Sequence, residues 1–143
     1  MIYFLDASAI VKKYIAERGS DRLRALVRAR REFAIARVSQ VEVPAALARR
    51  AREGDLRRDV AERHAAQFDD DVAAMRVVEL RPPVLNIASR LVWAHPLRAY
   101  DALQLAAAIH LKRMSQTAVT FVAADGPLCD AAAAAELKLE RLA

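Results

Sequence analysis

Four acidic residues of this 143-residue chain stand beside apolar segments. They are Asp6, Glu42, Asp101 and Asp125. Asp6 follows the apolar run Ile2–Leu5, and Asp125 follows a second such run, Val119–Ala123. Carboxylates gathered without cations repel one another, and their pKa values rise. A divalent cation with oxygen ligands neutralises them, so the four acids predict a Mg²⁺ or Mn²⁺ site.

Each acid also has a local structural explanation. Glu42 ends an S-x-x-E pattern, which is typical of a capping box, and Asp125 precedes a Gly-Pro pair, as a helix N-cap does. Asp101 in a first helical turn favours the helix dipole. Asp6 has no local use except capping the next helix, and Ser8 can cap that helix equally well. Taken together, the four positions favour one shared site over four separate caps.

Other patterns that carry chemistry are missing from the sequence. The three histidines lack the spacing of zinc ligands, and there is no glycine-rich phosphate-binding loop. Cys129 is the single cysteine, has no basic neighbour to activate it, and is predicted to be a buried apolar residue. Trp93 and Phe68 are predicted to be packing residues rather than surfaces on which a nucleic-acid base stacks.

The acids must be positioned by the elements around them, and apolar patterning indicates where those elements lie. Short apolar runs predict strands at 2–5, 33–36, 76–80, 119–123 and, weakly, 137–142. Helical spacing, caps, glycines and prolines predict helices at 8–15, from 20 or 21, and at 39–53, 56–75, 82–94, 99–114 and 126–135. Strands separated by helices predict an α/β fold in three layers, with a central, mostly parallel sheet of about five strands flanked by helices. Sites in such sheets lie at the carboxyl ends of the strands.

Composition limits the class of protein. Hydrophobic residues make up 55% of the chain, and the formal charge is +5, which predicts one folded domain over residues 1–143. A single cysteine cannot form an internal disulfide and fits a reducing compartment. The first residues lack the features of a signal peptide, and no apolar stretch is long enough to cross a bilayer. A cytoplasmic protein without a membrane span is therefore expected.

Positive charge concentrates between residues 18 and 63, which hold thirteen arginines and seven acids. Arginine pairs with phosphate and carboxylate alike, so this surplus of positive charge is explained by binding to RNA or to an acidic protein. A solvated helix face without a partner explains it equally well. A helical hairpin at Ser39–Met75 carries much of this charge. Its charged side is a candidate RNA-binding surface, in which Arg49, Arg50 and Arg57 are expected to contribute, and its apolar side is a candidate groove for a partner helix.

Four segments resemble the PIN-domain nucleases, and most closely the VapC toxins of type II toxin–antitoxin pairs. They are FLDASA at 4–9, SQVE at 39–42, LRAYDALQLA at 97–106 and TFVAAD at 120–125, in the family's usual order and spacing. The R-x-x-D-A-L-x-L-A pattern is the most specific of them. The resemblance implies a PIN-like fold and a metal-dependent endoribonuclease, in which a metal-activated water cleaves RNA into 5′-phosphate and 3′-hydroxyl products.

By the same motifs, the implied catalytic and metal-binding residues are Asp6, Glu42, Asp101 and Asp125. The family varies at the fourth position. Asp125 is therefore expected to bind the metal directly, to contact it through water, or only to shape the electrostatic field of the site. Ser8 matches the hydroxyl residue that often accompanies the first acid, and Arg98 is expected to contact phosphate or to form an ion pair. The resemblance further implies one or two Mg²⁺ ions, with Mn²⁺ able to substitute, and a homodimer inhibited by a cognate antitoxin whose C-terminal segment lies in the hairpin groove.

Rival enzyme families fit less well. A phosphotransfer receiver domain needs an acceptor Asp after its central strand, where this chain continues into Leu80 and Arg81. A haloacid-dehalogenase-type phosphatase needs a second Asp two residues after the first, where this chain has Ser8. Two alternatives stay open: a catalytically weak PIN-like module that binds RNA or protein, and a housekeeping RNA-processing nuclease on the same fold.

Overall fold

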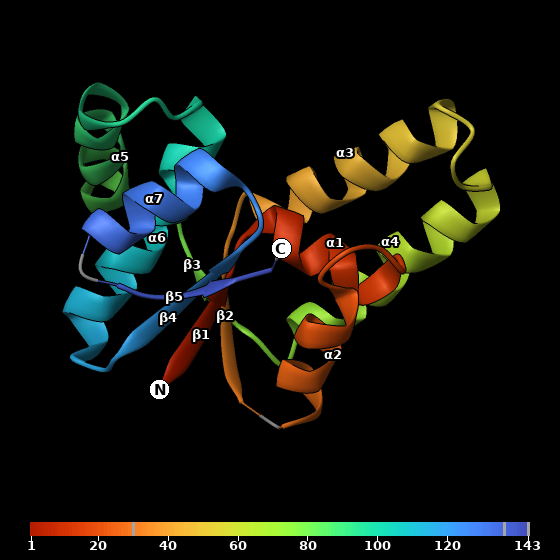
Figure 1. Ribbon diagram of the computed structural model, residues 1–143, viewed down its shortest axis with the longest axis horizontal. Helices are drawn as coiled ribbons and strands as arrows, with labels where there is room; N and C mark the ends of the chain where they lie inside the picture. The colour runs from red at the N-terminus through yellow and green to blue at the C-terminus, as the bar shows by residue number, and fades with distance from the viewer. Residues whose placement is uncertain (30, 136, 143) are drawn as a thin grey trace.

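The computed structural model of the protein describes residues 1–29, 31–135 and 137–142 (Figure 1). Its strands are β1 (Ile2–Leu5), β2 (Glu32–Ala36), β3 (Arg76–Val78), β4 (Val119–Ala123) and β5 (Lys138–Arg141). Its helices are α1 (Ala7–Tyr14), α2 (Ser20–Arg28), α3 (Ser39–Arg52), α4 (Arg58–Val72), α5 (Pro82–Ala94), α6 (Ala99–Ser115) and α7 (Gly126–Ala134). Helices connect successive strands, as a parallel sheet requires.

The strands of the described ranges form one sheet in the order β3-β2-β1-β4-β5, and all of its pairings are parallel. In the centre, Phe4 of β1 pairs with Ala34 of β2 on one side and with Phe121 of β4 on the other. After β3 the chain crosses to the far side of β1, so the strand order reverses between β1 and β4. Open α/β sheets bind ligands at such a reversal point, outside the carboxyl ends of the strands.

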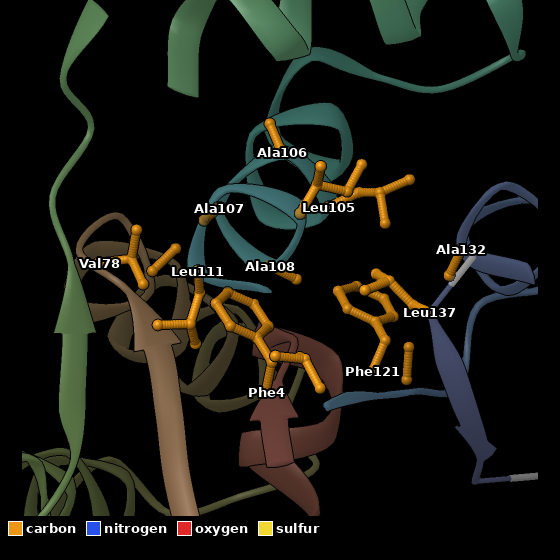
Figure 2. Close-up of a cluster of buried hydrophobic side chains, with 14 of the residues drawn as sticks. Phe4, Val78, Leu105, Ala106, Ala107, Ala108, Leu111, Phe121, Ala132 and Leu137 are labelled. Atoms are coloured by element: carbon orange, nitrogen blue, oxygen red, sulfur yellow. The ribbon is translucent and has the colours of Figure 1, made fainter. Parts of the chain in front are cut away.

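Helices cover both faces of the sheet, because successive strand residues point to opposite sides. Phe4 and Phe121 face α5, α6 and α7, and their rings stack 5.8 Å apart against the alanine-rich face of α6 (Figure 2). On the other face, Leu5, Ile35 and Val122 pack with the apolar sides of α1, α2, α3 and α4. The predicted three-layer α/β/α arrangement is therefore confirmed.

Most element boundaries agree with the sequence-based expectation to within three residues, the structure decides the open question of which residue caps α1, and one packing prediction is wrong. Asp6, and not Ser8, caps α1, since the Asp6 side chain accepts a hydrogen bond from the backbone N–H of Ser8. Trp93 of α5 is 91% exposed instead of packed, whereas Phe68 is buried as predicted. Cys129 is also buried, as expected.

The predicted arginine-rich hairpin is formed by α3 and α4, which extend side by side away from the sheet (Figure 1). Gly54, between the two helices, adopts a φ of +82°, a conformation that other residues rarely take, and so permits the turn. In the part of the chain that the structure describes, no helix combines the length and the apolar character of a membrane span.

Candidate functional site

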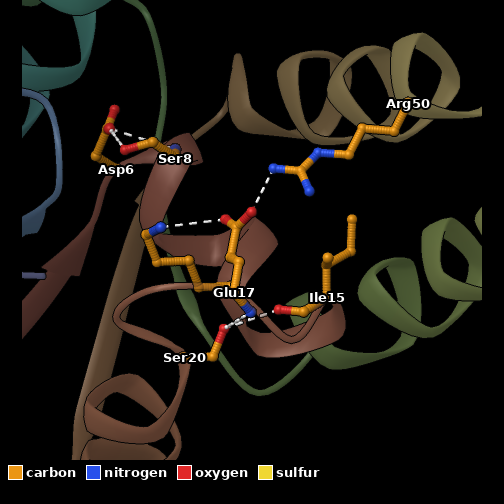
Figure 3. Close-up of polar contacts among 7 residues, drawn as sticks. Asp6, Ser8, Ile15, Glu17, Ser20 and Arg50 are labelled. Carbon is orange, nitrogen blue, oxygen red and sulfur yellow. Dashed lines mark hydrogen bonds and ion pairs between the residues drawn. The ribbon is translucent and has the colours of Figure 1, made fainter. Parts of the chain in front are cut away.

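Asp6 lies at the carboxyl end of the central strand and is almost completely buried, with 3% of its surface exposed. Its backbone N–H donates to the carbonyl oxygen of Val122, which continues the pairing of β1 with β4. Its carboxylate oxygen Oδ2 accepts hydrogen bonds from the hydroxyl of Ser8 (2.5 Å) and from the Ser8 backbone N–H (3.3 Å), as Figure 3 shows. Capping and carboxylate positioning are thus two effects of the same pair of residues.

Glu42 is presented by the first turn of α3. The capping box, which was the local alternative for Glu42, is not formed, because Val38 occupies the N-cap position without a side-chain hydrogen bond and Ser39 is buried. Instead, Nε2 of Gln104 on α6 donates to Oε1 of Glu42 (3.1 Å) and to Oγ of Ser39 (2.9 Å). Gln104 is fully buried, and its Oε1 has no hydrogen-bond partner within the described ranges. The amide therefore joins α6 to α3 and directs a donor at Glu42.

Asp101 and Asp125 both stand at helix N-termini. Arg98 forms the expected ion pair with Asp101, with 3.4 Å between Arg98 Nε and Asp101 Oδ2, but its side chain is 88% exposed. Such a solvated pair contributes little to stability, so the guanidinium stays accessible to a phosphate. Asp125 caps α7 as predicted, accepting a hydrogen bond from the backbone N–H of Leu128 at 3.1 Å.

One cleft joins these side chains. It has a volume of about 770 Å³, and its lining includes all four acids together with Ser8 and Arg98. The topology explains the convergence, because β1 and β4 are adjacent parallel strands that deliver Asp6 and Asp125 to the same edge. The first turns of α3 and α6 complete the acidic wall with Glu42 and Asp101. Every site residue predicted from the sequence thus faces one space.

The cluster has a strong affinity for positive charge. Burial raises the pKa of Asp6 to about 6, with a further increase from the charge of Asp101 and an opposing effect of the hydrogen bonds from Ser8. Burial raises the pKa of Glu42 to about 7, and the charges of Asp6 and Asp101 add to the effect. Burial also raises the pKa of Asp101, although Arg98 opposes this. Protons or a cation therefore bind here more readily than at isolated carboxylates.

The donor set fits a hard divalent cation, since every acidic side chain of the cleft offers carboxylate oxygens. Within the described ranges, no three His, Cys, Asp or Glu side chains stand in an arrangement that would hold an ion by themselves. Mg²⁺ does not require such a cage, because it keeps several waters and is usually bound by one or two carboxylates together with substrate phosphates. The open acidic cleft suits that mode of binding.

Sequence reasoning missed three residues at this site: Gln104, Tyr100 and Arg52. Gln104 is a polar residue within the apolar part of α6, one turn after Asp101, and that contrast with its neighbours was the available signal. Tyr100 lines the cleft beside Asp101 and is 60% exposed. Arg52 lines the cleft from the end of α3, and only the helix geometry brings it there.

The three arginines predicted to bind RNA lie in different surroundings. Arg49 lines the cleft. Arg50 forms an ion pair with Glu17 in the segment between α1 and α2 (Figure 3). Arg57, just before α4, pairs with Asp59 at 3.0 Å and is not part of the cleft lining. Of the three, Arg49 alone faces the acidic cluster.

Known proteins share both the sequence pattern and the fold. Residues 3–125 match the model of the PIN domain. The chain is 39% identical over 109 residues to Ribonuclease VapC45 of Mycobacterium tuberculosis, an alignment that covers 76% of this chain and 75% of that protein.

Among solved structures, VapBC2 from Rickettsia felis bound to a DNA fragment from their promoter has a TM-score of 0.66 at 14% identity, with full coverage of both chains. FitAcB from Neisseria gonorrhoeae has a TM-score of 0.69 at 15% identity, covering 97% of this chain and 96% of that one. The chain therefore belongs to the PIN-domain family, in which it is similar to the VapC ribonucleases.

Proposed function

We propose that this protein is a metal-dependent endoribonuclease and the toxin of a toxin–antitoxin pair. The observation that carries the proposal is the convergence of Asp6, Glu42, Asp101 and Asp125 on one cleft at the carboxyl edge of the sheet. The raised pKa values of Asp6 and Glu42 indicate that the cleft attracts positive charge. The 39% identity to a protein named Ribonuclease VapC45 supports RNA as the substrate.

Mg²⁺ or Mn²⁺ would be held by the carboxylates of Asp6, Glu42 and Asp101, one or two of them directly and the others through water, with Asp125 acting directly or through water. When bound, the ion supplies the positive charge that lowers the pKa of an attacking water and offsets the charge of the scissile phosphate. Attack on phosphorus breaks the bond to the 3′ oxygen, which leaves a 3′-hydroxyl on one fragment and a 5′-phosphate on the other. No side chain is needed as a nucleophile.

The protein's own groups orient the carboxylates and the phosphate. The Ser8 hydroxyl holds Asp6 at the end of β1, and the Gln104 amide holds Glu42 across the cleft. Because each carboxylate is fixed by a hydrogen bond, the site loses little conformational entropy when it binds its ligands. Arg98, exposed beside Asp101, offers its guanidinium to an oxygen of the phosphate.

Cleavage of total cellular RNA by the purified protein tests the proposal. The wild-type protein with Mg²⁺ or Mn²⁺ should cut RNA at discrete positions, and mapping of the ends should find 5′-phosphates. Excess EDTA, or the Asp101→Asn substitution, should abolish the cuts. The matched control is Asp69→Asn, which makes the same chemical change at an exposed position of α4.

Two results would overturn this assignment. Full activity in Asp101→Asn would show that the acidic cluster is not catalytic. Absence of cleavage by folded, partner-free protein at every metal concentration would favour a PIN-like module that binds RNA or protein without cutting.

The antitoxin is proposed to bind the groove between α3 and α4. This groove has a volume of about 490 Å³ and is lined by Pro44, Leu47, Ala48, Ala51, Arg52, Arg58, Ala61, Glu62 and Ala65. Small apolar side chains let a partner helix approach closely and bury its own apolar face. The arginines at the edge favour acidic residues on that partner.

A charge placed in the groove tests this partner site. Ala48→Glu puts a carboxylate on the exposed side of α3, and it should weaken inhibition by the cognate antitoxin while leaving RNA cleavage intact. Ala133→Glu, at an exposed position of α7, is the control. Equal inhibition of both variants would place the partner elsewhere.

A homodimer is proposed to form through the outer side of α5. Leu85, Val92 and Trp93 are 45%, 40% and 91% exposed there, an unusual display of large apolar groups on one helix. Because Trp93 is the only tryptophan, its fluorescence reports on this surface directly. Dilution should shift its emission to longer wavelength as the dimer dissociates, and Val92→Asp should sediment as a monomer. A wild-type monomer at micromolar concentrations would refute the dimer.

A further inference from the structure

The cleft that holds the acids has a second, basic end. Its wall along α3 consists of Val41, Glu42, Ala45, Ala46, Arg49 and Arg52, with Val38 just before the helix. These positions recur every three or four residues, so they form one side of the helix. At 1.5 Å per residue, Arg49 and Arg52 stand roughly 10 Å and 15 Å along the axis from Glu42. An anionic chain placed along this wall therefore passes from the acidic end to the two arginines.

The two arginines are not used by the fold. Both side chains are exposed, and across the described ranges neither one has an ion-pair or hydrogen-bond partner. Two other arginines of the α3–α4 hairpin do have ion-pair partners, since Arg50 pairs with Glu17 and Arg58 pairs with Glu62. Arg49 and Arg52 therefore face the cleft without a carboxylate partner among the described residues, unlike Arg98, and each can form a charge-assisted, bidentate contact with phosphate.

The opposite wall offers an aromatic ring. Tyr100 lines the cleft directly before Asp101 and is 60% exposed, and Val41 on the α3 side is 69% exposed. An exposed ring beside a phosphate-cleaving centre is a stacking surface for an unpaired base. Trp93, the other strongly exposed aromatic side chain, is not part of the cleft lining.

We propose that Arg49, Arg52 and Tyr100 form a subsite for single-stranded RNA on one side of the scissile phosphate. The arginines bind successive backbone phosphates, and the ring of Tyr100 stacks on the base next to the cleaved bond. A single strand is required, because bases within a duplex are not free to stack on a side chain. The inference rests on the proposed ribonuclease function and adds to it the path of the substrate. An acidic peptide could also contact the arginines, but it would make no use of Tyr100.

Binding without cleavage tests the subsite independently of catalysis. The probe is a fluorescein-labelled, unstructured RNA oligonucleotide in EDTA, and its anisotropy is measured over a range of salt concentrations. Each phosphate contact on a single strand contributes about 0.7 to the slope of log affinity against log salt. Arg49→Ala and Arg52→Ala should each lower this slope by about 0.7 and weaken binding by roughly three- to tenfold. Arg113→Ala, an exposed arginine at the other end of α6, should change neither quantity.

Tyr100 has a different expected signature. Loss of base stacking in Tyr100→Ala should weaken binding by roughly 5- to 100-fold with an unchanged salt slope, since the ring carries no charge. Tyr100→Phe should restore most of the affinity because it keeps the stacking face. In cleavage assays, all three alanine variants should raise KM more than they lower kcat.

The outcomes separate this inference from the proposed function. If wild-type protein cleaves RNA but the alanine variants match Arg113→Ala in affinity and KM, the subsite is refuted and the nuclease stands. If the variants lose affinity as expected but no protein cleaves RNA, the subsite stands and the proposed function fails. Unaltered RNA binding combined with weaker inhibition by a partner protein would assign the arginines to that partner and refute the inference.

Discussion

The acidic cluster should destabilise the metal-free protein at neutral and alkaline pH, and Asp6→Asn should relieve this. Asp6 has a pKa of about 6 in the folded protein against 3.8 for an ordinary aspartate. Between these two values the folded state binds more protons than the unfolded state. The free energy of unfolding must therefore fall as the pH rises through this range, and it levels off above the folded pKa.

The magnitude follows from the shift. A difference of about two pKa units at about 1.4 kcal/mol each gives a loss of about 3 kcal/mol from Asp6 alone. Glu42 acts in the same direction, but solvent reaches it, and the two groups titrate as a coupled pair, so their effects do not simply add. The lowered pKa values of Glu17 and Asp71 contribute stability that is lost as the pH falls through and below their ordinary values of 4.5 and 3.8. These two residues therefore have little effect on the pH dependence of stability above about pH 5.

Asparagine resembles the protonated form of Asp6 and can still cap α1 through its side-chain oxygen. Asp6→Asn should therefore raise the free energy of unfolding by up to about 3 kcal/mol at about pH 8, and by about half as much at about pH 5. Urea unfolding in EDTA across this range measures the effect, with Asp69→Asn as the surface control. Mn²⁺ should stabilise the wild type at the higher pH and leave Asp6→Asn unchanged. A less stable Asp6→Asn at pH 8, or a wild-type stability that rises over this window, would refute the reasoning.

Four further substitutions test the supporting structure. Gln104→Leu removes the donor to Glu42 and should lower Mn²⁺ affinity by roughly 10- to 100-fold in calorimetry, and wild-type affinity in this variant would contradict the positioning role of the amide. Gly19→Ala should cost about 1–3 kcal/mol in urea unfolding, because φ is +90° and the new Cβ would lie 3.0 Å from Cβ of Leu142. Gly54→Ala, at φ +82° in open space, should cost only about 1 kcal/mol, so equal losses would exclude crowding as the cause. Tyr14→Phe should cost roughly 1.5–3 kcal/mol in thermal unfolding, since the hydroxyl donates to Asp71 at 2.6 Å, and an unchanged melting temperature would show that this bond is not stabilising.

Local signals predicted the elements well because they act within a few residues. Pro82 and Pro83 predicted the start of α5, and the apolar runs at 2–5 and 119–123 predicted β1 and β4 at their observed bounds. The alternation of strands and helices then implied parallel pairing, which places the carboxyl ends of β1 and β4 at one edge. The sequence alone therefore places Asp6 and Asp125 together at that edge.

Predictions were less successful where a residue distant in sequence decided the contacts of a side chain. The S-x-x-E pattern before Glu42 favoured a capping box, but the buried Gln104, which lies 62 residues away in sequence, takes both Ser39 and Glu42 as hydrogen-bond partners. Trp93 was expected to pack because large aromatic residues usually do, yet α5 packs its other side against α6. For Glu42, a contact from a distant segment outweighed the local capping pattern. For Trp93, no distant segment among the described residues covers the side chain, so its preference for burial is not met.

By itself, the sequence determined the acidic residues, the order of the elements and the edge of the sheet at which those residues meet. These properties follow from hydrophobic periodicity, from turn residues and from the geometry of parallel strands, all of which can be read along the chain. Only the tertiary structure decided which arginines face the cleft, since Arg49 and Arg50 are neighbours in sequence but turn about 100° apart around α3. The same holds for Gln104, whose role exists only because the fold brings its amide on α6 within hydrogen-bond distance of Ser39 and Glu42 on α3. Charge and polarity are properties of the residue, whereas the group that each one meets is set by packing.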